Sequence, residues 1–241
     1  MSYDANSMIN TQTESRPQAW RNVFAAILLS CLIIGLPNFV ILPRLLPDNI
    51  DLRSGAAWFL ALYAVCVVIV TGLIFVWLRR ANSSLAELGW GKPTTILAVA
   101  LGVIFGLAWL GLGLFGAGFA LKGKVDLNLT EINLFRLAMA LLGVVITVGE
   151  EIIMRGFVMT ELNRVAVPTW LQIVVSGLGF ALYHSLGNFG LASLIPSFIV
   201  GAIWAVIYVL GKRSLTPSII SHGIVNFFGE PYLAMMILSV Y

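Results

Sequence analysis

Charged residues are scarce in this sequence: 10% of its 241 residues are charged, whereas 59% are hydrophobic. An ordinary soluble domain has about 25% charged and about 45–50% apolar residues. A water-soluble fold of this length could not cover so much apolar surface. The composition therefore excludes a soluble globular domain and indicates that the lipid bilayer is the solvent.

Cysteine and histidine are also rare, with two residues of each. Cys31 and Cys66 lie inside apolar runs and lack the spacing of metal ligands, so we interpret them as buried thiols rather than as a disulfide. The 14 basic residues are scattered between apolar runs instead of being massed on one face. This pattern indicates membrane topology and excludes a nucleic-acid partner.

Apolar runs of the length that a bilayer requires, about 20 residues, follow one another along the chain. We interpret residues 1–20 as a polar, disordered N-terminal tail, residues 21–130 as N-terminal transmembrane helices, and residues 131–241 as a second helical segment. The runs cover residues 23–42, 56–78, 96–121, 132–151, 168–186, 191–210 and 217–241, and the last is broken by Gly229-Glu230-Pro231. The sequence thus predicts an all-α, polytopic transmembrane helix bundle of about seven to eight spans.

Two features of the first half indicate helix shape and packing. Pro37 interrupts the first run and predicts a kink. Gly102 and Gly106 have the spacing of small residues that lets two helices approach closely.

The arginine and lysine residues between the runs predict the orientation of the bundle. If the spans alternate, eight basic residues fall on one side, and cytoplasmic loops are the ones enriched in such residues. They are Arg16, Arg21, Arg79, Arg80, Lys92, Arg164, Lys212 and Arg213, whereas the opposite side has Arg44, Arg53, Lys122 and Lys124. We therefore expect a multi-pass protein of the cell membrane with a cytoplasmic N-terminus.

An ionisable side chain at membrane depth is costly, which makes it a candidate functional residue. Glu150, Glu151 and Arg155 stand at the end of an apolar run. On a helix, Glu151 and Arg155 lie four residues apart on one face and can form an ion pair, while Glu150 points about 100° away. Glu150 is then available as a general base; the alternative is a structural ion pair at a helix end that reaches the interface.

Both histidines lie in late apolar runs. His184 follows Phe180 by one helical turn, and His222 precedes Asn226 by one turn. Imidazole can exchange a proton near neutral pH, and an imidazole and an amide on one helix face suit the negative oxygen of a tetrahedral intermediate. Each group taken alone also fits a packing role through hydrogen bonds between helices. Together with Glu150, these groups supply a base, a water-holding group and oxyanion donors for amide hydrolysis.

These motifs carry a family resemblance. The order Glu-Glu-x-x-x-Arg, Phe-x-x-x-His and His-x-x-x-Asn resembles that of the CAAX prenyl-protease and bacteriocin-processing family of intramembrane proteases (CPBP, also called Abi). The resemblance covers residues 134–228, including the Gly156-Phe157 that follows the first motif. It implies that residues 131–241 form an intramembrane protease core of the CPBP type. One departure is Ser221, where members often have alanine, and it does not affect the chemistry.

The resemblance implies a role for each motif residue. Glu150 is the catalytic base, His184 helps to bind the water, and His222 and Asn226 stabilise the oxyanion. Glu151, Arg155 and Phe180 are supporting residues. We favour hydrolysis without a metal cofactor; zinc remains open as an alternative, with Glu150, His184 and His222 as its ligands.

The resemblance also implies the function. We expect an intramembrane endopeptidase of the CAAX protease type that acts on a peptide or lipidated-protein substrate among membrane lipids. The alternative is a non-catalytic membrane binding or bacteriocin-immunity protein with the same fold. A transporter would show internal repeats, and none is apparent. We further expect a polar cavity that opens to the cytoplasmic side between the fourth to seventh spans.

Overall fold

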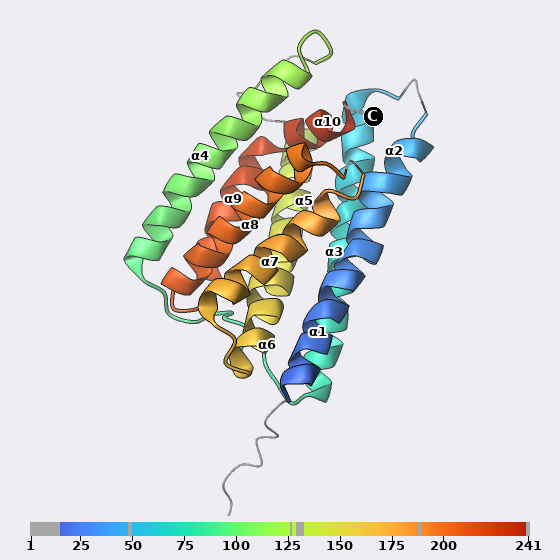
Figure 1. The fold of residues 1–241 in the computed structure, drawn as a ribbon. Coiled ribbons are helices and arrows are strands. Elements are labelled where there is room, and N and C mark those ends of the chain that lie inside the picture. Colours follow the sequence, from blue (N-terminus) through green and yellow to red (C-terminus); the bar gives the residue numbers. More distant parts are fainter. Residues whose placement is uncertain (1–14, 48–49, 126, 129–132, 188, 240–241) are drawn as a thin grey trace, which may run out of the picture.

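The computed structural model describes residues 15–47, 50–125, 127–128, 133–187 and 189–239. Within these ranges every regular element is a helix, as the sequence predicts. The helices form one bundle, shown in Figure 1. They are α1 (Arg16–Leu29), η1 (Ser30–Ile41), α2 (Leu42–Leu45), α3 (Leu52–Arg80), α4 (Ile96–Ala120), α5 (Leu134–Glu151), η2 (Ile152–Val158), α6 (Met159–Arg164), α7 (Thr169–His184), α8 (Leu191–Leu210), α9 (Thr216–Gly229) and α10 (Tyr232–Leu238).

In the described part of the chain, five continuous helical stretches are long and apolar enough to cross a membrane. They are Arg16–Leu45, Leu52–Arg80, Ile96–Ala120, Leu134–Arg164 and Leu191–Leu210. Many large apolar side chains on their outer faces are exposed, as suits contact with lipid tails. The protein is therefore a multi-pass, membrane-embedded helical protein.

The predicted count of seven to eight spans is not confirmed, because two predicted spans form shorter helices. The predicted span 168–186 becomes α7, with 16 residues, and the run after residue 216 divides into α9, with 14, and α10, with 7. All three are shorter than the roughly 20 residues that a straight crossing requires. The polar tail predicted for residues 1–20 is also shorter, since α1 begins at Arg16; residues 1–14 lie outside the described residues.

Several helices start at a side chain that accepts a hydrogen bond from the first turn. Asp51, Thr95 and Asn133 accept from the backbone N–H groups three residues further along at the starts of α3, α4 and α5. Such caps satisfy N–H groups that have no partner inside the helix. They explain why these helices begin where polar residues meet apolar runs.

Two segments have the wider π-helical turn. The first, η1, contains Pro37, which lacks a backbone N–H and disrupts the regular hydrogen-bond pattern. The side chains of Ser30 and Asn38 donate to the carbonyls of Ala26 and Ile34, each four residues earlier, whereas Oδ1 of Asn38 has no hydrogen-bond partner among the described residues. The second, η2, directly follows Glu150 and Glu151, and such turns are frequent at functional sites.

The eight basic residues that the sequence assigns to one side lie around one end of the bundle. Figure 1 shows that α1 and α4 begin at this end and that α3, α6 and α8 end there. Polar contacts join the connecting segments, since Arg164 binds Glu87 and Ser83, and Arg213 donates to Gln172. Partial burial acts to raise the pKa of Glu87, but the hydrogen bonds and charge of Arg164, together with hydrogen bonds from Ser84 and Ser83, hold this pKa below its usual range.

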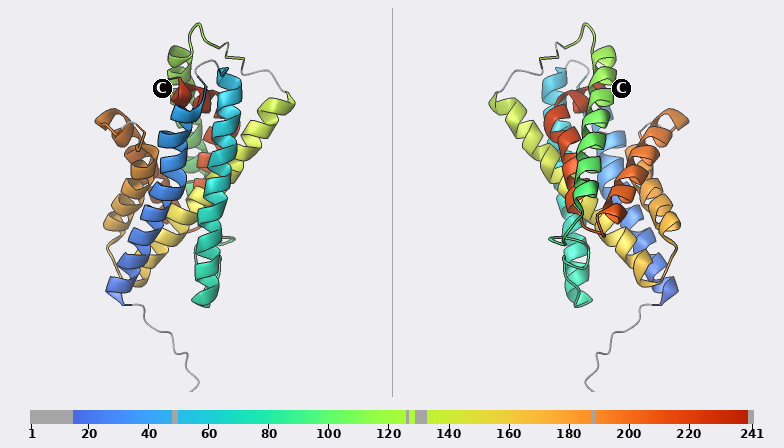
Figure 2. Two further views of the ribbon diagram at one scale, coloured as in Figure 1. Left: turned by 90° about the vertical axis from the view of Figure 1, so that its right-hand side faces the viewer. Right: turned by 90° about the vertical axis from the view of Figure 1, so that its left-hand side faces the viewer.

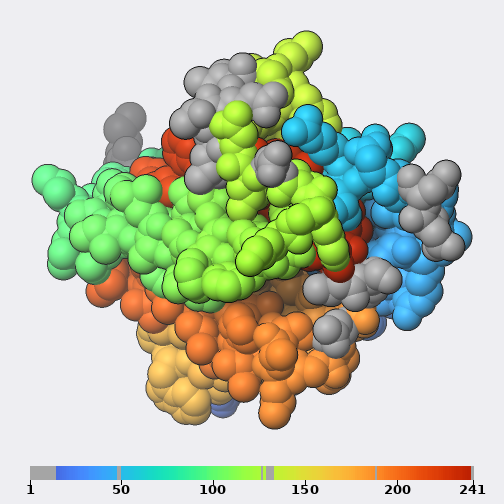
Figure 3. Space-filling view, turned by 90° about the horizontal axis from the view of Figure 1, so that it is seen from above, coloured from blue at the N-terminus to red at the C-terminus, as the bar shows by residue number. Residues whose placement is uncertain are grey.

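The opposite end carries α10. Figure 3 looks onto this end and shows atoms of α4, of the first helices and of α8 around those of the last helices. Figure 2 shows that α5 is tilted strongly against α3 and crosses the bundle obliquely. This tilt brings the last turn of α5, with Glu150 and Glu151, into the middle of the bundle.

Candidate active site

Glu150 is buried at the centre of the bundle, with 1% of its surface exposed. Its Oε1 atom accepts hydrogen bonds from the hydroxyls of Tyr63, at 2.6 Å, and Tyr183, at 2.7 Å. Its Oε2 atom has no hydrogen-bond donor among the described residues and lies 3.6 Å from Nε2 of His222. One carboxylate oxygen is thus fixed in place, and the other is left to accept a proton.

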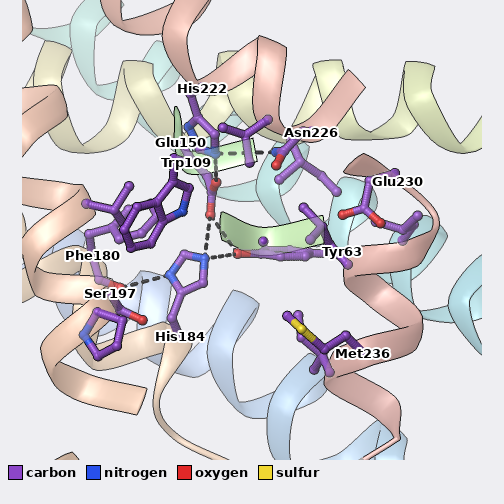
Figure 4. A pocket seen from close by; sticks show the side chains of 18 of the residues that line it. Tyr63, Trp109, Glu150, Phe180, His184, Ser197, His222, Asn226, Glu230 and Met236 are labelled. Carbon is purple, nitrogen blue, oxygen red and sulfur yellow. Dashed lines mark hydrogen bonds and ion pairs between the residues drawn. The ribbon is translucent and has the colours of Figure 1, made fainter. Parts of the chain in front are cut away.

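His184 lies on the other side of the same carboxylate, as Figure 4 shows. Its Nε2 atom is 3.6 Å from Oε1 of Glu150 and 3.0 Å from the hydroxyl of Tyr63. Its Nδ1 atom is 2.9 Å from the carbonyl oxygen of Phe180, which assigns a proton to Nδ1. The ring of Phe180 stacks on the imidazole with centroids 4.1 Å apart. The supporting role predicted for Phe180 would act through these two contacts with His184.

Tyr63 and Tyr183 are site residues that the sequence interpretation missed. Tyr63 comes from α3, in the first half of the chain, and its hydroxyl lies between Glu150 and His184. A hydroxyl has one proton, so Tyr63 can donate to only one of the two at a time. A tyrosine in the middle of an apolar run was the available signal, but tyrosine is common in membrane helices and needs no functional explanation.

Glu151 points away from Glu150 and has different partners. Its Oε1 atom lies 3.1 Å from Nη1 of Arg155 and 3.0 Å from Nδ1 of His222. The ion pair with Arg155 at four residues' spacing is the one that the sequence predicts. The arginine also donates to the carbonyl of Gly201 and lies over the rings of Phe180 and Trp204. The buried arginine charge is thereby balanced by one carboxylate, although Nε of Arg155 and Oε2 of Glu151 have no hydrogen-bond partner among the described residues.

Residues of α5 and α8 hold His222 in place. Its Nδ1–H donates to Glu151, and its ring stacks on Trp204 with centroids 3.8 Å apart. The Nδ2 atom of Asn226 lies 3.3 Å from Nε2 of His222 and 3.0 Å from Oγ1 of Thr147. In the neutral ring Nε2 therefore carries no proton and accepts a hydrogen bond instead of donating one. Donation to an oxyanion requires the imidazolium form, which the neighbouring Glu151 carboxylate would balance.

A cavity of about 390 Å³ connects these residues. The four residues predicted as catalytic, Glu150, His184, His222 and Asn226, all line it. The remaining walls are mainly apolar, and α3, α4, α8 and α10 contribute to them, so the cavity is neither as polar nor as confined to the late helices as expected. It reaches α10, at the end opposite the eight basic residues. The opening on the cytoplasmic side and the cytoplasmic N-terminus both stay predictions.

The side chains that could ligate a metal ion are few at this site. Among the described residues no group of three or more histidine, cysteine or acidic side chains is arranged to hold a metal ion. The nearest candidates, His184 and His222, each lie 3.6 Å from Glu150, and they approach opposite oxygens of its carboxylate. His184 and His222 also have hydrogen-bond partners on their Nδ1 atoms.

The fold and this centre define a class: a polytopic membrane protein with a buried carboxylate between two histidines. Residues 132–228 match the family model Rce1-like, described as type II CAAX prenyl endopeptidase Rce1-like. This match confirms the resemblance predicted from the three motifs. No curated protein and no solved structure matches the chain. The predicted division at residue 131 remains a prediction.

Proposed function

We propose that the protein is an intramembrane endopeptidase in which Glu150 activates a water molecule for attack on a peptide bond. The observation that carries the proposal is the asymmetry of the Glu150 carboxylate. Two tyrosine hydroxyls fix Oε1, whereas Oε2 has no hydrogen-bond donor among the described residues and belongs to a residue that lines the cavity. A general base needs a correctly oriented and accessible proton acceptor.

The two histidines have separate roles in this proposal. His184, beside Oε1 and Tyr63, holds the attacking water close to the base. His222, charged by the proton that Glu150 accepts, donates Nε2–H to the negative oxygen of the tetrahedral intermediate. Asn226 keeps the His222 ring in position and can turn its amide toward the oxyanion when substrate displaces its present contacts. The proton then passes to the leaving amine.

Glu151 and Arg155 support this centre without taking part in bond breaking. The carboxylate of Glu151 binds the far side of His222 and fixes its Nδ1 proton. Arg155 in turn holds Glu151 and spans to α8 through Gly201. In this arrangement the chain supplies every proton transfer itself, so we propose hydrolysis without a metal cofactor and a cell-membrane location.

The substrate class follows from the family and the site together. A peptide or lipidated protein that approaches through the membrane would reach the cavity between the helices, and its scissile bond would lie at the depth of Glu150. Peptide hydrolysis by purified protein is the direct test, with quenched-fluorescent peptides, with and without a lipid on cysteine. Glu150→Gln should reduce kcat/KM by at least about 1,000-fold, since a general base and its orientation together contribute that much.

Two controls accompany this measurement. Glu87→Gln removes an exposed carboxylate outside the cavity and should leave activity unchanged. A zinc chelator should leave the wild-type rate unchanged; inhibition that added zinc reverses would replace the metal-free mechanism with a metal-dependent one. A folded wild-type protein that cleaves none of the peptides would instead favour the non-catalytic membrane binding or immunity protein.

A further inference from the structure

A second carboxyl group lines the same cavity and has no part in the proposed hydrolysis. Glu230 lies between α9 and α10 and is 7% exposed. Its Oε2 atom accepts a hydrogen bond from the backbone N–H of Ala234. Its Oε1 atom has no hydrogen-bond partner among the described residues. Glu230 thus differs from Glu150 and Glu151, which are each bound by several side chains.

The position of Glu230 is separate from that of the hydrolytic centre. In Figure 4 the ring of Tyr63 lies between the Glu150–His184 pair and Glu230, and the Glu230 carboxyl group is directed into the cavity. The residues of α10 that line the cavity are apolar, namely Leu233, Met236 and Ile237. The cavity therefore has a hydrolytic part and a second part that ends in one carboxyl group.

Among the described residues, no lysine or arginine lines the cavity to balance this group. Glutamate and histidine are the only ionisable side chains among the described wall residues besides Tyr63, and the wall has no lysine or arginine. A carboxylate in apolar surroundings is costly unless a cation or several hydrogen-bond donors contact it. A ligand that brings a positive charge to this position removes that cost, whereas a ligand with a carboxylate there increases it.

We propose that Glu230 forms a subsite for a basic side chain of the bound peptide, so that the protein selects substrates with lysine or arginine near the cleaved bond. The proposal rests on the proposed peptidase function, and it names the class of peptide that the same cavity takes. Peptides that would place an acidic residue at Glu230 are excluded. A purely structural role, in which Glu230 only caps the first turn of α10, predicts no such selection.

The test is a scan of the substrate with the purified full-length protein. A lysine, a norleucine or a glutamate is moved through the six residues around the cleaved bond of one quenched-fluorescent peptide. At one position the wild type should cleave the lysine peptide about 10-fold faster than the norleucine peptide, as expected for a hydrogen bond between charged groups. Glu230→Gln should bring the two rates to within about 2-fold, and Glu230→Lys should make the glutamate peptide the preferred one.

The matched control is Glu87→Gln, the same chemical change outside the cavity, which should keep the lysine preference of the wild type. Thermal unfolding of each variant separates a loss of selection from a loss of folding. If Glu230→Gln lowers the melting temperature and leaves the lysine preference intact, Glu230 is only a helix cap and the proposal is wrong. Equal cleavage of lysine and norleucine peptides by the wild type at every position also overturns it.

A binding measurement keeps this proposal separate from the peptidase function. Dye-labelled lysine and norleucine peptides are titrated against Glu150→Gln and against the double variant Glu150→Gln/Glu230→Gln. Tighter binding of the lysine peptide that disappears in the double variant supports the subsite, even if the wild type cleaves nothing and the proposed hydrolysis fails. Cleavage by the wild type without Glu230-dependent binding supports hydrolysis and overturns the subsite.

Discussion

Glu150 and Glu151 are adjacent in the sequence and identical in chemistry, and their surroundings give them different tasks. Glu151 lies between Arg155 and His222, which hold its charge. Glu150 is bound on one oxygen by two hydroxyls, which orient the carboxylate without neutralising it. A helix turns by about 100° between neighbours, and this rotation separates the structural carboxylate from the reactive one.

Removing the hydroxyl of Tyr63 tests how far orientation of Glu150 matters. We expect Tyr63→Phe to reduce kcat about 10- to 100-fold with little change in KM, because a hydrogen bond to a charged group contributes about 1.5–3 kcal/mol. Tyr208→Phe is the matched control, since Tyr208 is buried and donates to the carbonyl of Leu88 outside the cavity. A loss in both variants, or an effect on KM alone, would contradict the orienting role.

The sequence allowed the motif residues to be predicted but not their partners. Glu150, His184, His222 and Asn226 stand out because ionisable and amide groups are rare in apolar runs, and the structure places all four on one cavity. Tyr63 could not be found in this way, because its proximity to Glu150 depends on how α3 packs against α5, 87 residues away. Glu230 was visible only as a break between two helices.

At the scale of the helices, the glycines of α4 set its distance from α9. A Cβ atom at Gly106 would lie 2.6 Å from the backbone oxygen of Ser221, and one at Gly102 would lie 2.7 Å from that of Pro217. Close packing of this kind is what the spacing of the two glycines predicts. The contact matters for the site because Ser221 directly precedes His222.

Enlarging Gly106 should therefore affect both stability and activity. Gly106→Leu forces α4 away from α9, and overpacking of this kind costs about 1–3 kcal/mol, or roughly 2–12 °C in melting temperature for a chain of this size. We also expect activity to fall, because His222 moves with α9. Gly111→Leu is the control, since nothing lies within 4 Å of a Cβ atom there. Equal melting temperatures for the two variants would argue against close packing of α4 on α9.

Helix boundaries were predictable for two long apolar runs and less so elsewhere. The predicted runs 96–121 and 191–210 match α4 and α8 within one residue. The two π-helical segments were not predicted. Pro37 indicated only a kink, and the hydrogen bond from Asn38 to the carbonyl of Ile34, four residues earlier, is one that a regular helix also permits. The short lengths of α7 and α9 likewise reflect turns at the α10 end of the bundle, which apolar composition alone does not mark.

For the whole molecule, the orientation in the membrane decides which side supplies the substrate. The end with eight basic residues is the predicted cytoplasmic end, and Lys212 lies there, whereas Lys124 lies at the α10 end and donates to the carbonyl of Ser239. In a background with Cys31→Ala and Cys66→Ala, single cysteines replace Lys212 or Lys124. We expect a membrane-impermeant maleimide to label intact cells only through position 124.

The reverse labelling pattern would place the α10 end, and with it the part of the cavity near Glu230, in the cytoplasm. The expected pattern instead directs this part of the cavity to the outer side, which favours peptides that are exported or that leave the bilayer on that side. Labelling of both positions to the same extent in intact cells would contradict a single fixed orientation. Permeabilised cells, in which both positions should react, provide the control for reactivity.

The contribution of α3 to the site has a consequence for how related sequences are compared. Tyr63 lies outside residues 132–228, the segment that the family model covers, yet its hydroxyl holds the proposed base. A survey that infers activity from the three motifs alone would class a chain without this hydroxyl as an active peptidase. Ancestry would be assigned correctly in such a chain, but its catalytic competence would depend on a helix that the survey never aligned.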